Sequence, residues 1–148
     1  MADNAHAATV LAFDFGTRRI GVAVGNTLVR LAHPLTTIDC ERIDSRFAAI
    51  DALLTEWRPL RLVVGLPTHA DVAEHAMTAR ARRFARQLEG RCNLPVDLVD
   101  ERWTTEAADY DLRDAGTSIA KRKGVRDQVA AQRILQSWFD DGPAVATK

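Results

Sequence analysis

Three acidic residues stand where a carboxylate could take part in catalysis: Asp14, Glu101 and Asp127. Asp14 follows the apolar residues of an expected strand in LAFDFGTRRIGVAVG, residues 11–25, where an unpaired carboxylate would be costly. Glu101 comes directly after the last expected strand. Asp127 is in phase with the apolar residues of an expected helix, including Ile134, so it should point inward.

Three carboxylates directed at one region repel one another, and a divalent cation would relieve that repulsion. Mg²⁺ or Mn²⁺ is bound by hard oxygen ligands of this kind, together with phosphate oxygens of a substrate. One or two such ions could activate water and stabilise the leaving oxygen of a phosphodiester. The residue types therefore fit metal-dependent hydrolysis, although their spacing alone does not establish it.

Each acid also has a purely structural interpretation. Asp14 could cap the turn at Gly16 and Thr17, Glu101 could pair with Arg102, and Asp127 could be an acid favoured by the helix dipole. Asp100 competes with Glu101 for the same role. The joint placement of the three acids at the ends of elements favours the functional interpretation.

The elements that would position these acids follow from hydrophobic periodicity. Strands are expected at 9–13, 20–24 and 35–38, and their short connections predict an antiparallel meander. Further strands are expected at 62–65 and 96–99, each after an amphipathic helix. The first helix, from Ile43 to Trp57, should end before Pro59, and the second should end at Gly90.

After the last strand, Thr104 could cap a third helix. Residues 115–124 are expected to form an exposed, mobile loop, and a final helix should run from about Val125 to Phe139. This order predicts an α/β fold in which a mixed sheet, with three antiparallel and two parallel strands, is flanked by helices. The chain is expected to be a single domain over 1–148, with flexible tails at 1–8 and 142–148.

Composition narrows the class of protein. The chain has 148 residues, with 20 basic residues balancing 20 acidic ones, so any polyanion would have to meet a local basic patch. The sequence contains no apolar segment of membrane-spanning length and no apparent secretory signal. The isolated cysteines fit no metal-binding or redox motif, and a cytoplasmic location with no membrane partner is expected.

Several motifs occur in a recognisable order: AFDFGTRRIGVAVG, VVGLP, TARARRFA, VDERWTT and RDQVAAQRIL. From about Val10 to Phe139, the chain resembles the YqgF or RuvX family of pre-16S rRNA nucleases, formerly described as Holliday junction resolvases. The resemblance implies an RNase H-like fold and a divalent-metal nuclease that trims the 5′ side of precursor 16S rRNA. It also implies an acidic triad of Asp14, Glu101 and Asp127. The segment 68–72 departs from the glycine-containing turn common in the family, which leaves substrate detail open.

Basic residues beside these acids are candidates for binding the phosphate backbone. Arg18 follows the first turn, and Arg102 could position Glu101 or the scissile group. Others would occupy the loop before Asp127: Lys121, Arg122, Lys123 and Arg126. Such contacts would provide affinity and salt dependence without sequence recognition. The same loop could instead serve only to keep the chain soluble.

Other functions remain alternatives to rRNA processing. The residues Asp14 to Thr17 match the phosphate turn of actin-like and sugar-kinase ATP-binding proteins, but those proteins need a second domain. Branched DNA could replace RNA as the substrate, which would require a homodimer rather than a monomer. A non-catalytic RNA-binding factor in transcription or ribosome assembly would not need the three acids.

Overall fold

The computed structural model describes residues 8–16, 18–40, 42–66, 72–100 and 119–141. The strands are β1 (Thr9–Asp14), β2 (Arg19–Asn26), β3 (Ala32–Asp39), β4 (Arg61–Leu66) and β5 (Val96–Asp100). The described helices are α1 (Ile43–Trp57), α2 (Val72–Cys92) and α4 (Ile119–Asp141). None of the described helices is both long and apolar enough to cross a membrane.

The strands form one mixed sheet in the order β3-β2-β1-β4-β5. β1, β2 and β3 pair antiparallel through short connections, whereas β4 and β5 join β1 in parallel through helical crossovers. This arrangement confirms the α/β fold class predicted from the sequence. Because β1, β4 and β5 run in the same direction, their carboxyl ends lie at one edge of the sheet.

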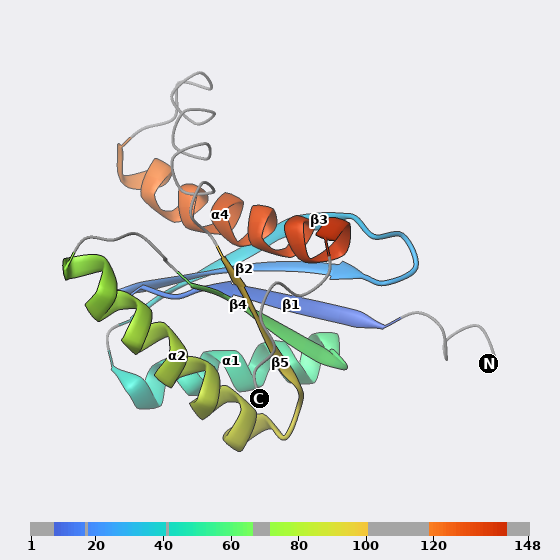
Figure 1. The fold of residues 1–148 in the computed structure, drawn as a ribbon, viewed down its shortest axis with the longest axis horizontal. Helices are drawn as coiled ribbons and strands as arrows, with labels where there is room; N and C mark the ends of the chain where they lie inside the picture. Colours follow the sequence, from blue (N-terminus) through green and yellow to red (C-terminus); the bar gives the residue numbers. More distant parts are fainter. Residues whose placement is uncertain (1–7, 17, 41, 67–71, 101–118, 142–148) are drawn as a thin grey trace.

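Helices cover both faces of the sheet, with α1 and α2 on one side and α4 on the other (Figure 1). Alternate residues of β1 divide between two apolar cores. Leu11 and Phe13 pack with α1 and α2, whereas Val10 and Ala12 pack with α4. This alternation follows from the two-residue period of a strand, and it fixes the face on which each later residue lies.

Small residues on β2 let α4 lie close to the sheet. Gly21, Ala23 and Gly25 alternate with Ile20, Val22 and Val24, which face the other core. A side chain at Gly25 would place its Cβ 2.8 Å from the Phe139 ring, and one at Gly21 would overlap the backbone of Asp127. The position of α4 along β2 is therefore set by close backbone contact.

A buried carboxylate also holds α4 in place. Asp97 on β5 is 7% exposed and accepts a 2.8 Å hydrogen bond from Trp138 Nε1 on α4. Arg61 Nη1 on β4 donates to both oxygens of the same carboxylate, at 2.9 and 3.0 Å. The polar network links α4 to two parallel strands, because a buried carboxylate requires such partners.

Two helix boundaries differ from the sequence predictions. α2 continues through Gly90 to Cys92 and is followed by Asn93 in the left-handed conformation. α4 begins at Ile119, so residues 119–124 are helical rather than part of the predicted loop. Helix-favouring residues surround Gly124, whose cost of about 1 kcal/mol does not interrupt the helix.

Several other predictions fall outside the described residues. They include the loop residues 115–118, the helix that Thr104 would cap, and the substituted segment 68–71. The predicted tails are also outside, except for Ala8, which exchanges hydrogen bonds with Thr27 of the β2–β3 connection.

Candidate active site

Asp14 is the last residue of β1 and lies at the carboxyl edge of the parallel strands. It is half-buried and opposes Gly21 of β2 in the antiparallel register. Alternation along β1 places Asp14 on the same face as Val10 and Ala12, which pack with α4. The carboxylate therefore belongs to the face of the sheet that α4 covers.

Asp127 reaches the same part of this face from α4. Its backbone lies directly against Gly21, the residue that opposes Asp14. Its side chain is 17% exposed, as the helical phase predicted. The structure thus brings Asp14 and Asp127, which are distant in sequence, to neighbouring positions on one face of the sheet.

Arg19 pairs with Asp127 across the β2–α4 contact. Arg19 Nε donates a 2.8 Å hydrogen bond to Asp127 Oδ2, and the arginine side chain is 22% exposed. Burial raises the pKa of Asp127, while the hydrogen bond and positive charge of Arg19 act in the opposite direction. Arg19 both orients this carboxylate and reduces the cost of keeping it ionised.

The remaining acid of the predicted triad, Glu101, lies outside the described residues, as does Arg102. The described part of β5 ends at Asp100, which is exposed and pairs in register with Leu66 of β4. Among the residues that the structure describes, no group of three or more acidic, histidine or cysteine side chains could hold a metal ion. The complete triad therefore remains a prediction.

The predicted substrate-binding residues have different environments. Arg18 is 69% exposed and lies 3.7 Å from Asp39, an exposed pair that water screens strongly. Lys121, Arg122 and Lys123 occupy the first turns of α4, which corrects their assignment to a loop; their side chains are outside the described set. Arg126 is half-buried in the same helix, directly before Asp127.

Sequence reasoning missed two residues that position Asp127. Neither Arg19 nor Gly21 is among the candidate site residues identified from the sequence. Strand alternation contained a signal for both, because it places Arg19 and Gly21 on one face with Ala23. It could not identify α4 as the element that covers this face.

The loss of Arg19 should raise the pKa of Asp127 further in the metal-free protein. We expect Arg19→Ala to cost about 1–3 kcal/mol of stability at pH values above the Asp127 pKa, where the carboxylate would lose its partner. Because the Asp127 pKa is raised, its protonated form favours folding at low pH, and this contribution is lost as pH rises through the folded pKa. The cost of Arg19→Ala should therefore increase with pH.

An NMR titration that follows the side-chain carboxyl carbon of Asp127 would measure its pKa. Denaturant unfolding at several pH values would measure the stability of the protein. Arg18→Ala provides the matched control, because Arg18 pairs with exposed Asp39 rather than Asp127. An unchanged or lowered Asp127 pKa in Arg19→Ala would contradict this role of Arg19.

The arrangement of strands and helices resembles two solved structures of RuvC. RuvC of T. thermophilus in complex with a Holliday junction substrate gives a TM-score of 0.58 at 17% identity, covering 92% of this chain and 98% of that one. A second Thermus thermophilus RuvC structure gives a TM-score of 0.51 at 14% identity, with 88% and 93% coverage. These matches identify the fold as RNase H-like, the fold predicted from the sequence motifs.

The sequence comparisons define the family more closely. The model of the family described as "RuvX: Holliday junction resolvase" matches residues 8–141, and the chain belongs to this family. A relative from Methylobacillus flagellatus is 59% identical over 131 residues, covering 88% of this chain and 90% of the relative. One from Chromobacterium violaceum is 56% identical over 137 residues, with 91% and 100% coverage. Both relatives bear the name "Putative pre-16S rRNA nuclease".

Proposed function

We propose that this protein is a divalent-metal-dependent nuclease that processes the 5′ side of precursor 16S rRNA in the cytoplasm. The names of the curated relatives support the substrate, and family membership supports phosphodiester hydrolysis. The observation that carries the proposal is the placement of Asp14 and Asp127 beside Gly21, on the face of the sheet covered by α4.

The donor set fits Mg²⁺ or Mn²⁺, because both ions prefer hard carboxylate oxygens. Asp14, Asp127 and Glu101 would hold one or two ions, with Asp14 as the central ligand. When bound, the metal would supply activation of water and stabilisation of the departing oxygen. Arg19 would hold the carboxylate of Asp127 in place through the 2.8 Å hydrogen bond.

Basic residues would bind the RNA backbone beside the acids. Arg18 follows β1 and is exposed, while Lys121, Arg122, Lys123 and Arg126 precede Asp127 along α4. Arg102 would contact the scissile group or position Glu101. These roles involve charge rather than base identity, so they predict affinity without sequence recognition.

A salt titration would test the basic segment. Replacing Lys121, Arg122 and Lys123 by glutamine keeps good helix-forming residues and should weaken RNA binding. Each lost phosphate contact with a single strand should reduce the slope of log affinity against log salt by about 0.7. Fluorescence anisotropy in EDTA would measure the slopes, and unchanged slopes would exclude these residues from the RNA interface.

Branched DNA is the second candidate substrate, because the family description names a Holliday junction resolvase. A resolvase must cut two strands of a junction, so this function would require a homodimer. RNA processing makes no such requirement and is compatible with a monomer. Sedimentation of the purified chain would distinguish these assemblies.

Cleavage assays would test the proposed function against both alternatives. The purified protein would be incubated with 5′-extended precursor 16S rRNA or a four-way DNA junction, in Mg²⁺, Mn²⁺ or EDTA. We expect cleavage of the RNA with either metal and none in EDTA. Preferential junction cleavage would favour the resolvase, whereas RNA binding without cleavage would favour a non-catalytic factor.

A further inference from the structure

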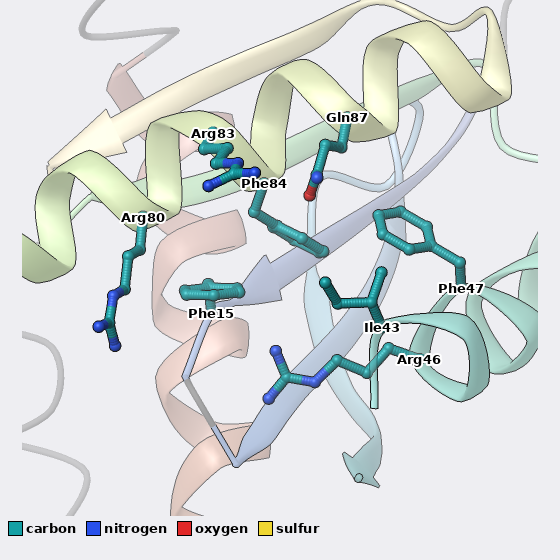
Figure 2. Close-up of a pocket in the computed structure, with 8 residues that line it drawn as sticks. All are labelled: Phe15, Ile43, Arg46, Phe47, Arg80, Arg83, Phe84 and Gln87. Carbon is teal, nitrogen blue, oxygen red and sulfur yellow. The ribbon is translucent and has the colours of Figure 1, made fainter. Parts of the chain in front are cut away.

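A pocket of about 240 Å³ opens between α1 and α2, beside the end of β1 (Figure 2). Its volume is below the roughly 300–1,000 Å³ typical of sites for drug-sized ligands, which favours a small group. Aromatic rings and arginine side chains provide most of its character: Phe15, Phe47, Phe84, Arg46, Arg80 and Arg83.

The aromatic residues of the pocket form a continuous cluster. The ring centroids of Phe15 and Phe84 are 4.9 Å apart, and those of Phe47 and Phe84 are 6.0 Å apart. Phe47 and Phe84 are buried, whereas Phe15 is only partly buried. Phe15 is therefore the ring of this cluster best placed to meet a planar ligand, since aromatic rings favour stacked contacts.

Arg46 holds this wall of the pocket in a fixed arrangement. The side chain is 6% exposed, and its Nη2 donates a 2.6 Å hydrogen bond to the Gly16 carbonyl oxygen. Its Nε donates to the carbonyl of Cys40, and its guanidinium lies 5.4 Å from the centroid of the Phe15 ring. These contacts tie Phe15 and Gly16 to α1, so the aromatic surface is preorganised.

The mouth of the pocket is basic, although the whole chain has no net charge. Arg80 and Arg83 are exposed on α2 about one helical turn apart, and both line the pocket (Figure 2). The described residues that line the pocket include three arginines and no carboxylate. This combination suits a ligand that is both planar and anionic, such as a nucleotide.

The pocket and the candidate active site are formed by consecutive residues at the end of β1. Phe15 follows Asp14, so their Cα atoms are about 3.8 Å apart. Asp14 faces α4, whereas Phe15 packs with the core under α1 and α2. An RNA strand with a phosphate at Asp14 could therefore direct a neighbouring base around the end of β1 toward Phe15.

We propose that this pocket receives one unstacked base of single-stranded RNA beside the scissile phosphate, and that Arg80 and Arg83 bind the flanking phosphates. The inference rests on the proposed nuclease function. A base inside a duplex is stacked and paired, so the site would select a single-stranded segment. The pocket would thus supply substrate selection that the acids alone do not provide.

Binding measurements in EDTA test the pocket separately from catalysis. The probes are a short single-stranded RNA and the same RNA with an abasic nucleotide beside the cleavage position. Phe15→Leu should weaken binding of the intact RNA by about 5- to 150-fold, because it removes a stacking surface but retains an apolar side chain. It should have little effect on the abasic RNA, since the base that stacks is already missing.

Arg80→Gln with Arg83→Gln should weaken binding of both RNAs and reduce the salt slope by about 1.4, or about 0.7 for each phosphate contact. Arg82→Gln is the matched control, because Arg82 is exposed on the same helix but does not line the pocket. We expect this control to bind both RNAs within about twofold of wild type, since it removes no proposed contact.

The proposal is overturned if folded Phe15→Leu binds both RNAs as wild type does, or loses equal affinity for both. If Phe15→Leu does not fold, two further results together overturn it: unchanged RNA binding by the double arginine variant, and no change in 2-aminopurine emission when the wild-type protein binds a third RNA that carries 2-aminopurine in place of the base proposed to stack. Normal RNA cleavage combined with either negative result would reject the pocket and retain the proposed function. Base-dependent binding without cleavage in Mg²⁺ or Mn²⁺ would support the pocket and reject the nuclease function.

Discussion

Asp14→Asn should reduce cleavage of precursor RNA by at least about 100-fold in Mg²⁺ while leaving the protein folded. Asparagine keeps the size of the side chain but removes the negative charge required of a central metal ligand. The magnitude is a lower estimate, because even residues that only support metal ligands typically contribute about 10- to 100-fold. Single-turnover cleavage at saturating protein would measure the chemical step apart from RNA binding.

Asp51→Asn provides a matched control for Asp14→Asn. Asp51 is an exposed aspartate on α1, away from the acidic face, and its replacement should leave cleavage unchanged. Thermal unfolding should confirm that both variants remain folded. Cleavage by folded Asp14→Asn at the wild-type rate would show that Asp14 is not catalytic.

Gly21→Ala should disturb both stability and catalysis, because the added methyl group would overlap the backbone carbonyl of Asp127. The new Cβ would also lie 2.9 Å from the Cβ of Asp127. A backbone obstacle cannot rotate away, so α4 must shift. We expect a loss of about 1–3 kcal/mol in the free energy of unfolding. A displacement of about 1 Å at a catalytic group can also reduce the rate by about 100-fold.

Gly90→Ala is the corresponding control in α2. A Cβ at Gly90 would meet nothing within 4 Å, so alanine should stabilise the helix by about 0.5–1 kcal/mol without changing cleavage. Denaturant unfolding and cleavage assays at a temperature where each variant is folded would separate the two effects. Wild-type stability and activity in Gly21→Ala would contradict the close packing of Asp127 against β2.

Local patterns in the sequence predicted most of the sheet because each strand carries its own signal. The apolar residues from Val10 to Phe13 indicated a strand with two buried faces, and short connections specified the antiparallel meander. The full extent of α4 was harder to predict. Charged residues and Gly124 resemble a loop in sequence, whereas the backbone of this segment is helical.

The candidate site was partly predictable for a similar reason. Strand ends and helical phase identified Asp14 and Asp127, but neither could reveal their partners. The Arg19–Asp127 pair depends on how α4 crosses β2, and the pocket depends on how α2 packs beside α1. The sequence alone does not distinguish Arg80 and Arg83 from other charged residues of α2, because only the tertiary arrangement shows that they line a pocket with Phe15.

Binding of Mn²⁺ most directly tests the central claim that Asp14 and Asp127 belong to one metal centre. Isothermal titration calorimetry would compare wild type, Asp14→Asn and Asp127→Asn in the absence of RNA. We predict that each substitution weakens Mn²⁺ binding by at least about tenfold, because each removes a carboxylate ligand. Wild-type affinity and stoichiometry in both folded variants would contradict a metal centre built on these two residues.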